Sequence, residues 1–332
     1  MGKSNTSKVF FYLRLIFGLF LLIILVKQIN FHQMAVVLTS ARSQFIAAAF
    51  LIMMLNFFLK TCRWASILWI HEPDISFGQL VRFNFISMFV ANFLPGTISS
   101  DVMRIYQVSK YTSKLGGAIS PIIVDRIIGN FSTVIVTVTA FITLQQTDLV
   151  RIGPLFSYGI FGILLLSVGA PLAMQNSNLI AGMRRLLSRF TRVKLLRRVP
   201  DMYEDIVSYQ NKYSPILKAL SISFLNPILT VFEFYIIATG FSSDTPIGYY
   251  FTFVPLAIFL AMLPISLGGI GVLEASVVFF FSKVGMPIET CLSIVIIHRV
   301  LFLLSTIPGG ILYMVEGFPA RKLSLSRKIG DL

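Results

Sequence analysis

The chain has 332 residues, of which 56% are hydrophobic and only 13% are charged. Soluble domains carry about a quarter charged residues, so this composition excludes a soluble globular protein and indicates an integral membrane protein. The net charge of +14 does not indicate a nucleic-acid partner, because many Lys and Arg residues lie in loops, where they mark the cytoplasmic side of a membrane.

Six apolar segments are expected to span a bilayer, which requires roughly 20 largely apolar residues. They begin near residues 9, 44, 118, 154, 213 and 291, and each is expected to be a helix. The first, 9–26, follows two lysines as a signal peptide would, but no small-residue cleavage site comes after it. The second, 44–59, is expected to end where Lys60, Arg63 and Trp64 supply cationic and interfacial side chains.

Two further apolar segments, 78–110 and 248–285, are interrupted near their middle by proline and pairs of small residues. Such residues free backbone groups from helical hydrogen bonds, which a membrane tolerates only where protein or water satisfies those groups. We therefore predict two re-entrant hairpins in addition to the six spans, giving an all-α, polytopic helix bundle. The residues of the two hairpin motifs are Leu94, Pro95, Gly96, Ser99, Ser100, Asp101, Pro264, Ser266, Gly268, Gly269 and Glu274.

The distribution of Lys and Arg favours this topology over eight plain spans. It places both termini, a basic loop at about 175–213 and a basic tail at 318–332 in the cytoplasm. Eight plain spans would instead put the 175–213 loop and the basic segment 104–114 outside. The expected location is therefore the cytoplasmic membrane, crossed several times by one transmembrane domain (1–332).

The two interrupted segments share a pattern of Leu-Pro, any residue, a hydroxyl, a branched aliphatic and two small residues. Each is followed by a helix that carries an arginine, Arg126 or Arg299, with two hydroxyl residues six and seven positions later. This indicates an internal repeat, about 44–144 and about 213–315, whose copies would run in opposite directions, as in many transporters. The alternative interpretation is that such short motifs recur by chance in apolar sequence.

Ionisable residues inside the spans are the candidate functional residues. Each costs at least ~2.5–3.5 kcal/mol to insert, so it lines a cavity or pairs with a partner. Asp125 and Arg126 are neighbours on one helix and therefore need separate partners. A structural role would lock hairpin to helix, through pairs such as Glu274 with Arg126 or Asp101 with Arg299. The candidate head-group ligands are Arg104, Arg126 and Arg299, and the candidate charge partners are Asp125, Glu233 and His298.

A functional role for the arginines would be to bind an anionic head group. Guanidinium groups bind phosphate through two parallel hydrogen bonds, and exposed backbone N–H groups at helix starts also favour anions. The sequence carries no catalytic motif, and its three histidines, His32, His71 and His298, have no second ligand at metal-binding spacing. We therefore expect no enzyme activity, metal or cofactor.

Several motifs together resemble the lysylphosphatidylglycerol synthase transmembrane-region family, also called flippase-like. The resemblance covers about residues 8–318, and the chain departs from the family pattern at Ser99-Ser100, where paired glycines are usual, and at Leu273, where an arginine commonly stands. It implies a membrane region that moves lipid across the bilayer. Because the chain ends at Leu332, without a soluble aminoacyl-transferase domain, lysyl transfer is not expected. The motifs are 92–96, Asp101, Arg104, Asp125-Arg126, 263–274, Arg299 and Gly309-Gly310.

Three functions remain open at this point. The first is a translocase or scramblase for an anionic lipid, either a phospholipid or a polyprenyl-phosphate lipid, with membrane lipids as its partners. The second is a secondary transporter of a small solute, with Asp125, Glu233 or Glu274 as a proton site. The third is an accessory subunit of envelope glycan or lipid assembly, in which the buried charges are only structural.

Overall fold

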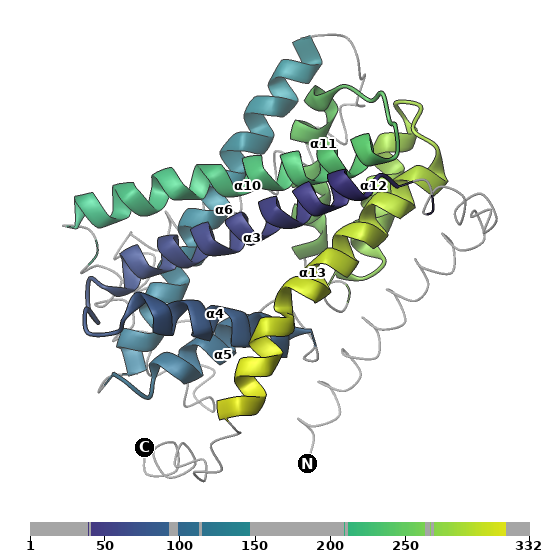
Figure 1. Cartoon of the computed structure of the whole chain (residues 1–332). Helices are drawn as coiled ribbons and strands as arrows, with labels where there is room; N and C mark the ends of the chain where they lie inside the picture. Colours follow the sequence, from purple (N-terminus) through teal and green to yellow (C-terminus); the bar gives the residue numbers. More distant parts are fainter. Residues whose placement is uncertain are drawn as a thin grey trace, which may run out of the picture.

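The computed structural model describes residues 39, 41–92, 99–112, 115–146, 209, 212–262, 266 and 269–316, and all regular structure within them is helical (Figure 1). Within these residues, four of the eight helices contain stretches that are long and apolar enough to cross a membrane, Ser43–Leu68, Gly117–Ile142, Tyr213–Gly240 and Ile288–Val315. The prediction of an all-helical membrane protein is therefore confirmed. The spans expected near residues 9 and 154, the basic loop apart from its last residues, and the basic tail lie outside the described residues.

The helices form two groups of four in the same order of long, short, short and long. The first group is α3 (Ser43–Leu68), α4 (Phe77–Ala91), α5 (Ser99–Val108) and α6 (Leu115–Gln146), and the second is α10 (Tyr213–Gly240), α11 (Ile247–Met262), α12 (Val272–Ser282) and α13 (Ile288–Glu316). We call them the first and second units. Helix α10 begins 170 positions after α3, and α11 begins 170 positions after α4. We call this separation of 170 residues the repeat interval.

The segments predicted as hairpins each contain two short helices with a break between them. Helices α4 and α11 have 15 and 16 residues, and α5 and α12 have 10 and 11. At about 1.5 Å per residue, none of them reaches the ~30 Å thickness of a bilayer core. Helix α4 packs on α5, and α11 packs on α12. The break residues Leu94, Pro95, Gly96, Pro264 and Gly268 lie outside the described residues.

The principal helix contacts are matched between the two units. Within each unit the first helix contacts the second and the fourth, the second contacts the third, and the third contacts the fourth. Between the units, α4 packs on α13 as α11 packs on α6, and α6 packs on α10 as α13 packs on α3. Exchanging the two units therefore leaves this set of contacts unchanged.

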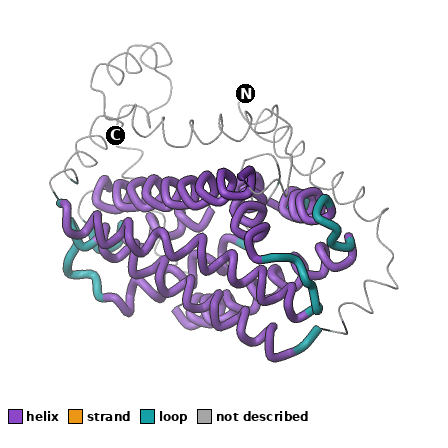
Figure 2. The backbone as a smooth tube through the Cα atoms, turned by 90° about the horizontal axis from the view of Figure 1, so that it is seen from above, coloured by secondary structure: helices purple, strands orange, loops and turns teal. Residues whose placement is uncertain are grey.

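Helices α3 and α10 lie side by side and run antiparallel at the boundary between the units (Figure 1). Figure 2 shows the described helices packed together and seen from above. The N–H of Arg42, before α3, donates to the carbonyl of Gly240 at the end of α10, with N and O 3.1 Å apart. Near the middle of α3, the Asn56 side chain donates to Thr230 Oγ1 at 2.9 Å and to the carbonyl of Asn226 at 3.4 Å. Asn56 and Asn226 are themselves separated by the repeat interval, so equivalent residues meet at this crossing.

Helix α3 corrects one expectation, because it continues to Leu68 instead of ending at Leu59. Trp64 is fully buried, and Arg63 pairs with an acid of another helix. These residues therefore face the interior of the bundle and not a membrane–water interface. The prediction of a helix end at Lys60 was wrong for this reason.

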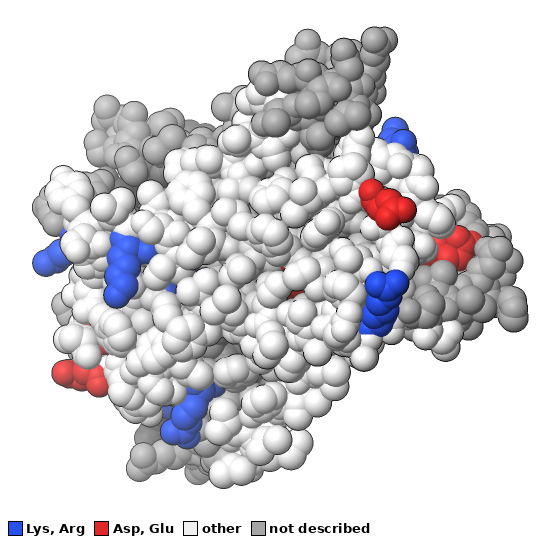
Figure 3. All heavy atoms as spheres, turned by 45° about the horizontal axis from the view of Figure 1, so that its top comes forward, with Lys and Arg blue, Asp and Glu red and all other residues white. Residues whose placement is uncertain are grey.

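Packing at the end of α13 depends on two glycines. A Cβ atom at Gly309 would lie 2.1 Å from the carbonyl oxygen of Phe85, and one at Gly310 would lie 2.6 Å from the Phe89 ring. Small residues of this kind let membrane helices approach at backbone distance. The outer surface carries exposed apolar side chains such as Met314 and Val315, and most of the face in Figure 3 is uncharged.

Candidate functional site

The charged side chains predicted to be functional form two clusters, one in each unit. In the first unit, Arg126 of α6 makes an ion pair with Asp101, which lies in the first turn of α5. A carboxylate in the first turn of a helix also interacts favourably with the helix dipole. Arg104, one turn further along α5, lies 3.1 Å from Asp101 and 3.7 Å from Asp125. Asp101 is thus shared by two arginines.

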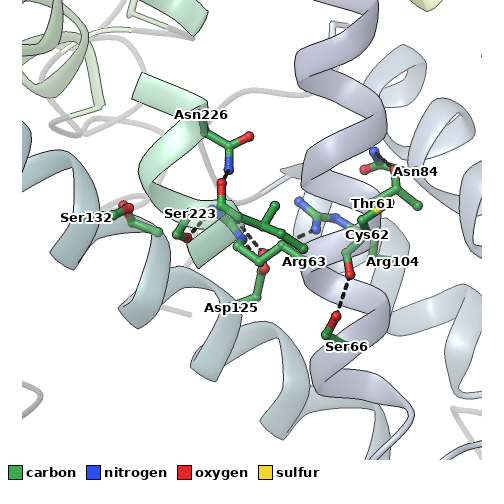
Figure 4. Close-up of polar contacts among 12 residues, drawn as sticks. Thr61, Cys62, Arg63, Ser66, Asn84, Arg104, Asp125, Ser132, Ser223 and Asn226 are labelled. Atoms are coloured by element: carbon green, nitrogen blue, oxygen red, sulfur yellow. Dashed lines mark hydrogen bonds and ion pairs between the residues drawn. The ribbon is translucent and has the colours of Figure 1, made fainter. Parts of the chain in front are cut away.

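Arg63 completes the first cluster and ties three long helices together (Figure 4). Its Nε and Nη2 donate to the two carboxylate oxygens of Asp125 on α6, at 2.6 and 3.0 Å, and its Nη1 donates to Ser223 on α10 at 3.0 Å. The Arg63 and Asp125 side chains are only 11% and 4% exposed. This two-point geometry is the strong form of an arginine–carboxylate pair, and it fixes both side chains.

In the second unit, Arg299 of α13 makes an ion pair with Glu274 in the first turn of α12. Its Nη2 also donates to Glu274 Oε2 and to the carbonyl of Gly269, both at 3.2 Å. Glu274 in turn accepts from the N–H of Gly271 at 2.8 Å. Both Gly269 and Gly271 have positive φ, 72° and 81°, which glycine adopts without a steric penalty. The glycines therefore shape the turn that presents Glu274 to Arg299.

A second pair in this unit joins Glu233 of α10 to His298 of α13. Glu233 Oε1 lies 2.5 Å from His298 Nδ1. The Glu233 side chain is 2% exposed and that of His298 is 17% exposed, with the imidazole ring 4.6 Å from the Phe234 ring. Whether this pair is ionic depends on the protonation of the imidazole.

The arginine pairs have the same construction in both units. Asp101 and Arg126 are separated by 25 residues, and so are Glu274 and Arg299. In both, the arginine lies on the last long helix and the acid begins the preceding short helix. The prediction of pairs between units, Glu274 with Arg126 and Asp101 with Arg299, was wrong, because each acid pairs with the arginine of its own unit.

The side chains of Arg126 and Arg299 each contact a buried acid and are also partly exposed at the surface of the bundle. The side chains of Arg126 and Arg299 are 41% and 31% exposed, whereas those of Asp101 and Glu274 are 5% and 9% exposed. Arg104 is more enclosed, at 15%, with its guanidinium over the Trp64 ring. Arg126 and Arg299 can therefore contact a molecule outside the bundle while remaining anchored.

The remaining predicted site residues lie near these clusters. Ser99 and Ser100 begin α5, and the buried Ser266 lies in the break before α12, where its hydroxyl makes no hydrogen bond within the described part of the chain. Among the residues that the structure describes, no group of three or more His, Cys, Asp and Glu could hold a metal ion. Sequence reasoning missed Arg63 and Ser223, although the buried acid Asp125 required a basic partner.

An apolar groove lies apart from the charges, between α6, α10 and α11. Its volume is about 390 Å³, and the residues that line it include Ile135, Thr139, Phe224, Ile228 and Phe251. It opens to the outside of the bundle, with almost no polar surface. In a membrane, such a groove faces lipid.

Comparisons with known proteins agree with the membrane architecture. A family model described as "Lysylphosphatidylglycerol synthase TM region" matches residues 11–309, which include every charged residue of both clusters. A protein of Methanothermobacter thermautotrophicus described as a "UPF0104 membrane protein" is 21% identical over 258 residues, which cover 73% of this chain and 76% of that protein. No solved structure matches the chain.

Proposed function

The chain belongs to the lysylphosphatidylglycerol synthase transmembrane-region family, and we propose that it moves an anionic lipid between the two leaflets of the cell membrane. The lipid is an anionic phospholipid or a polyprenyl-phosphate lipid. One observation carries the proposal: each unit holds an arginine, Arg126 or Arg299, that is fixed by a buried acid and yet about a third or more exposed. Such an arginine can bind an anionic head group through its exposed side, while its acid lowers the cost of keeping the charge in the membrane.

We infer that the two units form an inverted repeat. The matched helix contacts relate the units by a two-fold exchange, and α3 and α10 run antiparallel across its centre. If these helices cross the membrane, the axis lies in the membrane plane, as in many transporters. Under this arrangement α4–α5 and α11–α12 are re-entrant hairpins from opposite faces, and six full spans place both termini in the cytoplasm.

The acids make the arginines suitable for transient binding of a head group. Between lipid molecules, Asp101 and Glu274 neutralise the guanidinium groups and lower the cost of keeping them in the membrane. Within the described part of the chain, Nη1 of Arg299 makes no hydrogen bond, while Nε and Nη2 face Glu274. A phosphate group can therefore contact the outer edge of the guanidinium without displacing the acid.

The apolar groove supports a lipid and not a small solute as the substrate. Its wall of aliphatic and aromatic side chains between α6, α10 and α11 suits a hydrocarbon chain. In this arrangement the polar head group of the lipid contacts an arginine, and its apolar acyl chain lies in the groove. The lipid leaves unchanged, so no residue has a catalytic role and no cofactor is involved.

The test uses the purified full chain in liposomes that contain fluorescent phosphatidylglycerol, with dithionite added to bleach label in the outer leaflet. The proposal predicts that protein makes the inner-leaflet label accessible. The double variant Glu274→Arg with Arg299→Glu keeps an ion pair but moves the positive charge, so it is expected to fold and to lose this activity. Lys283→Gln, which removes an exposed cation at the end of α12, is the matched control and is expected to remain active.

Two results would contradict the proposal. The first is an equal rate of bleaching in vesicles with and without protein, for phosphatidylglycerol and for a polyprenyl-phosphate lipid alike. The second is wild-type activity in the charge-exchanged variant, which would reduce the Glu274–Arg299 pair to a structural lock.

A further inference from the structure

The Glu233–His298 pair occupies the position in the second unit that Arg63–Asp125 occupies in the first. Asp125 and His298 each directly precede the anchored arginine of their unit, Arg126 or Arg299. Arg63 and Glu233 are separated by the repeat interval, so they stand at the same position of α3 and α10. In both units the pair joins the first long helix to the last. The two pairs are therefore structurally equivalent.

The equivalent pairs have opposite polarity and different acid–base chemistry. In the first unit the cation is on the first helix and the acid on the last; in the second unit the acid is on the first helix. The guanidinium of Arg63 stays protonated at every physiological pH, so its pair with Asp125 is permanent. Imidazole is the side chain that ordinarily gains or loses charge between pH 5 and 8. Of the two pairs, only the one in the second unit can thus change its charge.

The Glu233–His298 pair, whose charge can change, lies at the boundary between the two units. Lys60 of α3 lies within electrostatic range of Glu233 and also of the Arg63–Asp125 pair. Helix α11 carries no charged residue. The Phe234 ring packs against the His298 imidazole. The charged groups of the two clusters engage partners of their own: Asp125 with Arg63, Arg126 with Asp101, Arg104 with Asp101 and Asp125, and Arg299 with Glu274. The remaining charged residues on the described helices that contact α10 or α13 are Arg82, Lys218, Glu289 and Glu316.

We propose that Glu233 and His298 form a proton-binding site whose occupancy is coupled to the movement of the anionic lipid; the coupling rests on the proposed function above. His298 is the more exposed partner and accepts the proton, and its Nδ1 lies 2.5 Å from the Glu233 carboxylate. Moving one charge across a membrane potential costs about 2.3 kcal/mol per 100 mV. One proton carried with one anionic head group cancels that charge, so the proton supplies both electrical neutrality and a driving force.

Proton binding can be measured without any lipid substrate. The whole chain has three histidines, so protein labelled with ¹⁵N at histidine gives three sets of imidazole signals, and His298→Gln identifies the one from His298. We expect this signal to titrate between pH 5 and 8 in the purified protein, and its titration to change in Glu233→Gln. A His298 signal that stays constant over this range, or one that titrates identically without Glu233, overturns the proton site.

Coupling is tested in the liposome assay over the same range of pH. The wild-type rate is expected to fall by about tenfold from pH 5 to pH 8, because the transported proton becomes scarcer and imidazole loses its charge over this range. His298→Arg gives the second unit a permanent pair like that of the first, and its rate is expected to vary by less than about twofold. His71→Gln, at an exposed position after α3, is the control and is expected to keep the full response.

The outcomes separate the two proposals. Lipid movement at a rate independent of pH, in wild type and His298→Arg alike, overturns the coupling and leaves lipid transport standing. Absence of lipid movement at every pH contradicts the proposed function and with it the coupling, and the histidine titration then decides the proton site alone.

Discussion

The two anchored arginines are expected to differ in their importance for stability. Arg299→Ala removes the only basic partner of Glu274 within the described residues and leaves a buried carboxylate with one N–H donor, that of Gly271. Arg126→Ala leaves Asp101 with Arg104, which remains 3.1 Å away. The same substitution should therefore be more damaging in the second unit.

The expected difference in stability between the two variants follows from the burial of the side chains involved. Removing one partner of a fully buried ion pair costs about 3–5 kcal/mol, because the other charge is left uncompensated. Arg299 is 31% exposed, so solvent screening reduces its loss to about 2–3 kcal/mol. For Arg126, which is 41% exposed and leaves a paired acid behind, about 1 kcal/mol is expected.

The assay is reversible denaturant unfolding in detergent, followed by the fluorescence of the two tryptophans. Adding Glu274→Gln to Arg299→Ala removes the stranded charge and should recover most of the lost stability. Equal losses of stability for Arg126→Ala and Arg299→Ala, or no recovery in the double variant, would show that a stranded Glu274 charge is not the cause of the loss.

Two further predictions concern packing and the fixed ion pair. Gly309→Ala places a Cβ 2.1 Å from the carbonyl oxygen of Phe85 and should lower stability in the same assay by about 2–3 kcal/mol. Gly78→Ala, whose Cβ would have no atom within 4 Å, is the control and should cause no loss. Similar stabilities of the two variants would contradict the close approach of α13 to α4. Asp125→Ala should lower stability by about 3–5 kcal/mol, because it leaves the guanidinium of Arg63 without its acid. Replacing both residues by leucine should recover most of the lost stability. A double variant as unstable as the single one would show that the stranded charge is not the cause.

Much of the fold follows from local features of the sequence. Long apolar runs predict the four long helices, and the prolines and glycines at the two breaks predict the short helices on either side of each. Helix geometry also correctly required separate partners for Asp125 and Arg126, since neighbouring residues point in different directions. These predictions succeed because each depends only on nearby residues.

The partners themselves depend on distant packing. Lys60, Arg63 and Trp64 after an apolar run resemble a helix end at the membrane surface, yet the same pattern also fits a helix that continues into a polar interior. A usable signal was present: Glu233 follows Arg63 at the repeat interval, which therefore places a buried charge at both positions. Likewise, the equal separation of 25 residues between acid and arginine in the two units favours pairing within each unit.

The opposite orientation of the two units in the membrane can be measured with single cysteines at equivalent loop positions. Asp74, before α4, and Asp244, before α11, are both exposed and are separated by the repeat interval. In a chain whose own Cys62 and Cys291 are replaced by serine, Asp74→Cys and Asp244→Cys are labelled in intact cells with a maleimide that does not cross membranes. The inverted repeat predicts that one position reacts from outside and the other only after the membrane is opened. Reaction of both from the same side would contradict it.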